Sequence, residues 1–105
     1  MPNYNGGKYL NASINSVINQ SHTNWELIIV DDCSTDNSSS IIKQFSNIDS
    51  RIKLYVLEQN SGTPATPRNK GFNKTRGDYI AFLDSDDVWH PRKLETQLKF
   101  MTKYK

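Results

Sequence analysis

The sequence predicts an α/β domain of three layers, with a mostly parallel sheet between helices on both sides. Two observations predict it. Short apolar runs rich in β-branched residues alternate with segments whose apolar residues recur at helical spacing. Two of the three apolar runs also end in clustered aspartates, and ligands of open parallel sheets bind at the carboxyl ends of the strands. The 105 residues suit a single domain, 1–105.

The first two helices are predicted on either side of the first apolar run. Residues 8–20 follow a glycine pair and repeat apolar side chains every three or four positions, as in Leu10, Ile14 and Val17. The second helix is expected to begin near Asp36, and we expect the Asp36 carboxylate to cap it.

The last two helices each have a proline near the beginning. Pro67 suits the first position of the third helix, with Thr66 as its cap. Pro91 opens the fourth helix, whose apolar face is formed by Leu94, Leu98 and Met101.

Three apolar runs are predicted to be strands, at 25–30, 52–57 and 78–83. Residues 25–30 have no polar alternation after Glu26, which is typical of a strand buried on both faces. The alternation of strands and helices then predicts parallel pairing.

The clustered aspartates predict a site for a divalent cation. Asp31 and Asp32 end one strand, and Asp84, Asp86 and Asp87 follow another. Carboxylates packed this closely repel one another unless a cation lies among them. Mg²⁺ or Mn²⁺ takes one or two carboxylates and completes its shell with water and phosphate oxygens. Asp84 and Asp86, two positions apart in an extended segment, would point to the same side.

Other interpretations of the polar residues stay open or fail. Asp31 is equally explained as a turn residue or a ligand, and Asp87 is a candidate for holding the following loop. The loop from Asp32 lacks the glycine and closing glutamate of a calcium-binding hand. No phosphate-binding glycine motif is present. For His90, a surface or capping role is favoured over the site.

Composition bears on the partners and the location to be expected. A net charge of +2 without a clustered basic face argues against nucleic acid. Cys33 is the only cysteine, so a reducing, cytoplasmic location is expected. No apolar run has the length of a membrane span. The basic stretch near the end is interpreted as a solvated helix face, the alternative being a patch for an anionic membrane surface: Arg92, Lys93, Lys99, Lys103 and Lys105.

Four blocks, in order and spaced along nearly the whole chain, resemble family 2 glycosyltransferases of GT-A fold. They are Met1 to Asn5, Trp25 to Asp36, Arg68 to Gly71, and Gly77 to Asp87. The resemblance implies a partial GT-A (Rossmann-like) domain that binds the nucleotide-sugar donor, most often a UDP-sugar, in an enzyme of bacterial polysaccharide synthesis. The intact enzyme would transfer the sugar, with inversion, to a hydroxyl of a glycan or lipid-linked acceptor, at the inner face of the membrane.

The resemblance also implies roles for individual residues. Pro2 and Tyr4 match the loop after the first strand, where an aromatic ring lies against the base. Asp32 matches an acceptor of a hydrogen bond from the base, and Arg68 a basic position near the base and diphosphate. The D-x-D motif comes last. It comprises Asp84, near the ribose or metal, Ser85 in the donor site, and Asp86 on the Mn²⁺ or Mg²⁺ itself.

Two departures from the family pattern are expected to matter. The β-branched first strand, which precedes the Pro2 block and lies between the strands at 25–30 and 78–83, is missing, which would leave unpaired backbone edges. The acceptor-binding half, which supplies the general base, is also absent, so no catalytic residue is assigned and the chain alone is expected to transfer poorly.

Two further function classes remain open. One is a non-catalytic nucleotide-binding or assembly module derived from such an enzyme. The other is a phosphorylated receiver-like signalling domain, against which stand Tyr4 and Arg68, residues that this chemistry does not need, and the lack of a lysine at the end of a further strand.

Overall fold

The computed structural model describes residues 1–63, 65–77 and 79–104, without the side chains of residues 101–104. Lys105 and residue 78 of the third predicted strand lie outside the described residues, as do residue 64 and the side chains of Met101 and Lys103. The elements in chain order are β1 (Pro2–Asn3), α1 (Gly7–Ile18), β2 (Leu27–Asp31), α2 (Ser38–Ile48), β3 (Ile52–Val56), α3 (Ala65–Lys74) and α4 (Lys93–Tyr104).

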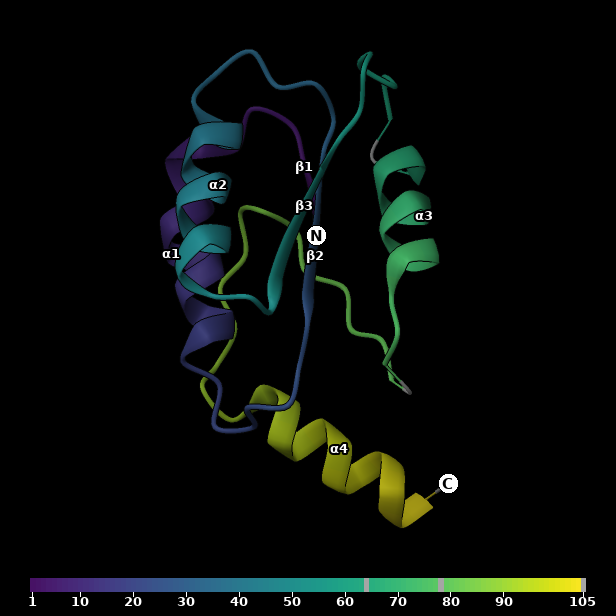
Figure 1. Ribbon diagram of the computed structural model, residues 1–105. Coiled ribbons are helices and arrows are strands. Elements are labelled where there is room, and N and C mark those ends of the chain that lie inside the picture. The colour runs from purple at the N-terminus through teal and green to yellow at the C-terminus, as the bar shows by residue number, and fades with distance from the viewer. Residues whose placement is uncertain (64, 78, 105) are drawn as a thin grey trace.

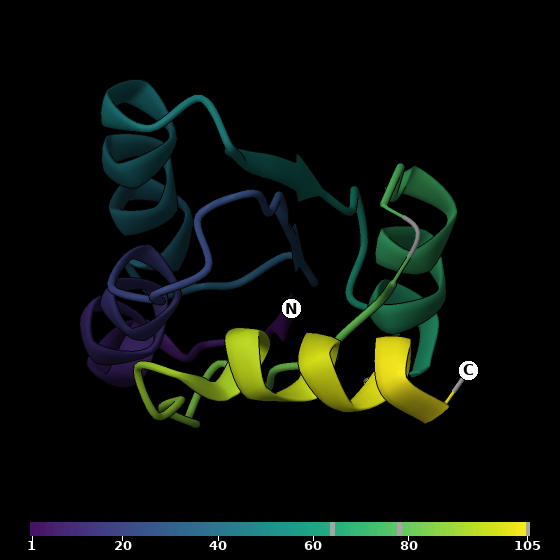
Figure 2. The same ribbon diagram turned by 90° about the horizontal axis from the view of Figure 1, so that it is seen from below.

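The described strands form one parallel sheet in the order β1-β2-β3, which confirms the predicted α/β class. β2 lies in the centre and is buried throughout, as the unbroken apolar run predicted. Its five residues all pair with β3, whereas β1 pairs only with Val30 and Asp31. Figure 1 shows α1 and α2 on one side of the sheet and α3 on the other, and Figure 2 gives the same layers from below.

The core lies between the sheet and the α1–α2 layer. Its fully buried side chains include Leu10 and Ile14 of α1, Ile29 of β2 and Ile42 of α2. These are the positions that helical periodicity and the apolar strand predicted, because a helix must bury its apolar stripe against the sheet.

Helix boundaries differ from the predictions by a few residues. α3 begins at Ala65, so Pro67 is its third residue and Thr66 lies inside it rather than capping it. Proline is tolerated there because the N–H groups of a first helical turn have no partner within the helix. α4 begins at Lys93, two residues after Pro91. Among the described residues, the helices are too short or too polar to cross a bilayer.

The strand predicted at 78–83 does not form in its described part, residues 79–83. Leu83 is buried in the core, but Phe82 is exposed. An apolar run becomes a strand only where a neighbouring strand offers free backbone groups. The neighbour that the resemblance assigns to this segment is a strand that precedes the Pro2 block, whereas β1 lies within that block.

A cleft of about 640 Å³ opens beside β2. Its lining includes Met1, Leu27 and Ile28 together with residues 79–83, α3 and α4. Met1 continues the pairing beside β1, since its amino group donates to the carbonyl of Ile28 at 2.8 Å and its carbonyl accepts from Val30 N–H at 3.0 Å. The carbonyl of Ile28 and the N–H of Val30 are therefore paired, contrary to the unpaired edge expected from the sequence.

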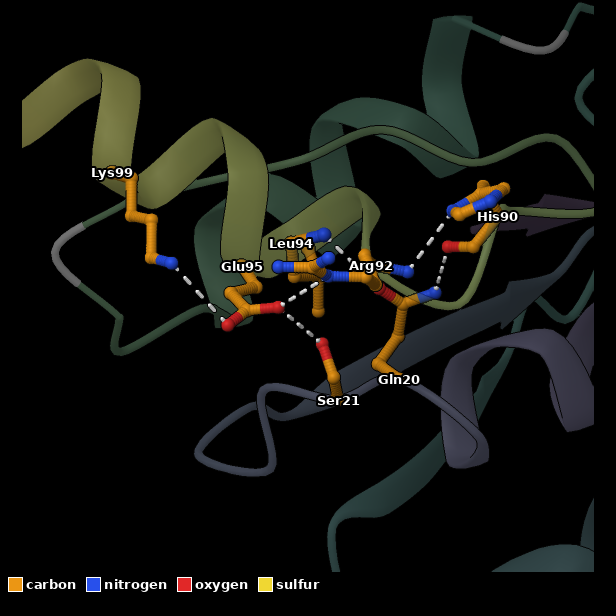
Figure 3. A network of polar contacts seen from close by, with 7 residues as sticks. All are labelled: Gln20, Ser21, His90, Arg92, Leu94, Glu95 and Lys99. Atoms are coloured by element: carbon orange, nitrogen blue, oxygen red, sulfur yellow. Dashed lines mark hydrogen bonds and ion pairs between the residues drawn. The ribbon is translucent and has the colours of Figure 1, made fainter.

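The beginning of α4 is held against the end of α1 by a polar network (Figure 3). Ser21 N–H donates to the carbonyl of Pro91 at 2.8 Å, and the Ser21 hydroxyl donates to Glu95 at 3.0 Å. Arg92 and Lys99 both pair with Glu95. His90 is exposed, and its Nδ1 accepts a hydrogen bond from Arg92 N–H at 3.2 Å, just before α4, which agrees with the surface or capping role favoured for this histidine.

Candidate functional site

The acidic motif after residues 79–83 folds into a tight turn. The N–H of Asp87 donates to the carbonyl of Asp84 at 3.0 Å, which closes four residues into one turn. The segment is therefore a turn, whereas the sequence predicted an extended segment. The carboxylates converge all the same: ligand oxygens of Asp84, Asp86 and Asp87 lie within 4.8 Å of one another, and all three residues are exposed. The turn thus adds Asp87 to the predicted pair.

Three converging carboxylates fit a hard divalent cation. Oxygen is the ligand that Mg²⁺ and Mn²⁺ prefer, and an exposed cluster leaves positions for water and phosphate oxygens. Without a cation the cluster carries repelling charges, which Arg68 relieves in part, since its Nη2 lies 3.5 Å from Asp84 Oδ1. Both side chains of this pair are substantially exposed, so the pair contributes little to stability.

Ser85, predicted in the donor site, faces the loop that follows β1. A Cβ atom built on Gly6 would lie 2.7 Å from Ser85 Oγ and 2.4 Å from Asn3 Oδ1. Glycine at position 6 therefore permits the acidic turn to approach the end of β1 closely.

Asp32 lies directly after β2 and is buried, with 4% of its surface exposed. Its backbone N–H donates to the carbonyl of Asn3 at 2.8 Å. Both of its carboxylate oxygens accept hydrogen bonds from Ser61, from the N–H at 2.8 Å and from the hydroxyl at 2.7 Å. Asn3 is thus next to both Asp32 and the Ser85 side of the acidic turn.

Asp31, left open by the sequence, makes structural contacts. Its Oδ1 accepts from the amide of Asn3 at 2.8 Å and from the hydroxyl of Ser34 at 2.6 Å, and its Oδ2 accepts from Ser34 N–H at 3.0 Å. With 1% of its surface exposed, Asp31 ties β1 to the loop after β2 rather than facing a ligand.

The loop after β1 carries Tyr4, which is 52% exposed, as base stacking would require. Pro2, predicted in the same loop, lies instead within β1, where it is paired with Val30, and it is buried. Pro2 therefore belongs to the strand that leads into the loop and not to the surface that would contact the base.

Asn5 is a site-forming residue to which the sequence analysis gave no role of its own. Its φ of 52° is in the left-handed region, which asparagine tolerates better than most residues. Its side-chain oxygen accepts from the N–H groups of Thr35 at 2.8 Å and Asp36 at 3.2 Å. Asn5 thereby fixes the loop after β1 to the loop after β2. The signal available in sequence was only its place in the block from Met1 to Asn5.

Asp36 caps two helices at once. Its Oδ1 accepts from Ser38 N–H at 2.9 Å, at the beginning of α2, and its Oδ2 accepts from Gly7 N–H at 3.0 Å, at the beginning of α1. Desolvation acts to raise the pKa of Asp36, but the hydrogen bonds from Ser38 and Gly7 outweigh it and lower the pKa from 3.8. The N-cap position of α2 is Asn37, so Asp36 supports the beginning of α2 from one residue earlier than predicted, and supports α1 as well.

Comparison with known proteins identifies the family. The profile of glycosyl transferase family 2 matches residues 1–105. TuaG of Bacillus subtilis, a glycosyltransferase named for teichuronic acid biosynthesis, is 52% identical over 100 residues, which are 95% of this chain and 39% of TuaG.

WfgD of Escherichia coli is named as a UDP-Glc:alpha-D-GlcNAc-diphosphoundecaprenol beta-1,3-glucosyltransferase. It is 47% identical over 103 residues, 98% of this chain and 40% of WfgD. The crystal structure of Staphylococcus aureus TarS 1-349 in complex with UDP has a TM-score of 0.92 and 34% identity, over 98% of this chain and 31% of that one. The chain thus spans about two fifths of the length of these curated relatives. It belongs to glycosyl transferase family 2.

Proposed function

We propose that this chain binds a nucleoside-diphosphate sugar together with Mn²⁺ or Mg²⁺, and that the whole enzyme transfers the sugar to an acceptor hydroxyl with inversion. The observation that carries the proposal is the convergence of three carboxylates in the turn from Asp84 to Asp87. The turn lies next to Arg68 and packs, through Ser85, against the loop that bears Tyr4.

Each side chain has a role suited to one part of the donor. The exposed ring of Tyr4 offers a face for the base, and Asp32 accepts a hydrogen bond from it. Arg68, 3.5 Å from Asp84, supplies positive charge for the diphosphate. Asp84 and Asp86 hold the cation. When bound, the cation neutralises the charge of the departing nucleoside diphosphate.

The donor and acceptor classes are supported by the relatives. TarS was crystallised with UDP, and WfgD is named for a UDP-sugar and a diphosphoundecaprenol acceptor. For this protein we therefore propose a UDP-sugar and a glycan or lipid-linked acceptor at the cytoplasmic face of the membrane. We assign the general base to the part of the whole enzyme that corresponds to the region of TuaG outside the match with this chain.

Calorimetry of UDP binding with and without Mn²⁺ tests the proposal. We expect Mn²⁺ to strengthen UDP binding by the 105-residue chain, and Asp86→Ala to abolish that gain. Glu58→Gln, which removes an exposed carboxylate from the loop after β3, is the matched control and should keep the gain. If UDP binding depended on Mn²⁺ equally in Asp86→Ala and in the parent, the site assignment would be wrong.

A further inference from the structure

Asp32 is held on both carboxylate oxygens by one residue. Ser61 N–H donates to Oδ1 at 2.8 Å, and Ser61 Oγ–H donates to Oδ2 at 2.7 Å. Because Asp32 is also buried, these two bonds prevent rotation of the carboxylate about its last torsion.

The loop around Ser61 is itself fixed to Asp32. The Asn60 amide donates to the carbonyl of Asp32 at 3.0 Å, and Gly62 N–H donates to Asn60 Oδ1 at 2.9 Å. Gly62 has a φ of 75°, a conformation that glycine adopts without steric cost. The Ser61 hydroxyl is also 2.8 Å from the carbonyl of Thr63, but its single hydrogen is better used on the charged carboxylate.

This arrangement defines what Asp32 can offer a ligand. Each carboxylate oxygen has about two acceptor positions, so each keeps one after binding Ser61. An ionised carboxylate accepts hydrogen bonds and donates none. It therefore matches a base with a ring N–H, such as N3–H of uracil or N1–H of guanine. Cytosine and adenine present a ring nitrogen lone pair at the equivalent position, which a fixed carboxylate repels.

We infer that Ser61 is a positioning residue that sets base selectivity, by fixing the Asp32 carboxylate as an acceptor toward bases that carry a ring N–H. The inference rests on the proposed function, since it concerns the base of the same donor. Without the Ser61 hydroxyl, the Asp32 carboxylate keeps only the bond from Ser61 N–H and can rotate. A water then binds Oδ2 and can donate to a base that lacks a ring N–H, so both kinds of base are accommodated.

Competitive calorimetry with UDP and CDP, both in the presence of Mn²⁺, tests the inference on the 105-residue chain. We expect the parent to prefer UDP, and Ser61→Ala to lower the ratio of UDP to CDP affinity by about tenfold. Ser61→Thr keeps both donors and should restore the parent ratio. Ser40→Ala, which removes an exposed serine hydroxyl in α2, is the matched control.

The outcomes separate this inference from the function on which it rests. A purely structural role for Ser61 would weaken UDP and CDP equally in Ser61→Ala, and that result overturns the inference. So does a parent that binds UDP and CDP alike, although nucleotide binding itself would then stand. A parent that binds neither diphosphate overturns both.

Discussion

Gln20 and His90 are joined across 70 positions of sequence, since the Gln20 side-chain amide donates to the His90 carbonyl at 2.8 Å (Figure 3). The same side chain accepts from Leu94 N–H at 3.0 Å and donates to Ser16 O at 3.0 Å. Gln20 is 3% exposed. One buried amide therefore connects the end of α1 to the beginning of α4.

Replacing Gln20 by alanine is expected to lower the free energy of unfolding by about 1–3 kcal/mol, because it leaves the carbonyl of His90 and the N–H of Leu94 without this partner. Urea denaturation measures the change. Gln59→Ala, at an exposed loop position, is the control and should stay within about 0.5 kcal/mol of the parent. If the Gln20→Ala and parent unfolding midpoints coincide, the amide does not hold α4.

Asn5 contributes through both its backbone and its side chain, and two substitutions separate them. Asn5→Gly keeps the positive φ at no steric cost but loses the acceptor for Thr35 and Asp36 N–H, so a loss of about 1 kcal/mol is expected. Asn5→Ala loses the acceptor and also strains the backbone, so it should be about 1 kcal/mol less stable than Asn5→Gly. Thermal or urea unfolding ranks them, and alanine as stable as glycine would refute the backbone part.

Sequence patterns predicted the local elements well because their causes are local. The repeat of Leu10 and Ile14 gave α1, and the clustered aspartates located the carboxylate site before any fold was known. Residues 79–83 were predicted wrongly because strand formation depends on a partner elsewhere in the chain. The contact of Ser61 with Asp32 could not be predicted either, since it joins residues 29 positions apart through a loop of irregular shape.

The ion pair of Asp49 and Arg51 makes the stability of the fold depend on pH. Arg51 Nη2 lies 2.7 Å from Asp49 Oδ2, and its guanidinium lies 3.7 Å from the centre of the Trp25 ring. Hydrogen bonding by Arg51 lowers the pKa of Asp49 from 3.8 in the folded chain. A lowered carboxyl pKa stabilises the folded state above the unfolded pKa, and this contribution is lost as the pH falls through the folded pKa.

Asp49→Asn is therefore expected to be less stable than the parent at pH 7, and the difference should shrink as the pH falls below 3.8. Urea titrations at several pH values measure it. Glu58→Gln, at an exposed site, serves as the control. A difference between Asp49→Asn and the parent that is constant with pH would show that ionisation of Asp49 is not the cause.

Asp87 is either a metal ligand or an anchor of the following loop, two roles that the sequence left open, and one substitution distinguishes them. Its side chain belongs to the three-carboxylate cluster, while its hydrogen bond to Asp84 uses the backbone N–H. Asp87→Asn leaves that backbone bond in place and removes one negative charge from the cluster. We therefore expect Mn²⁺ affinity in the presence of UDP to fall about tenfold, with an unchanged urea midpoint without metal. Calorimetric Mn²⁺ titration measures the first quantity. The opposite pattern, unchanged Mn²⁺ affinity with reduced stability, would make Asp87 an anchor of the loop, because a surface carboxylate that binds no cation can act only through contacts within the chain.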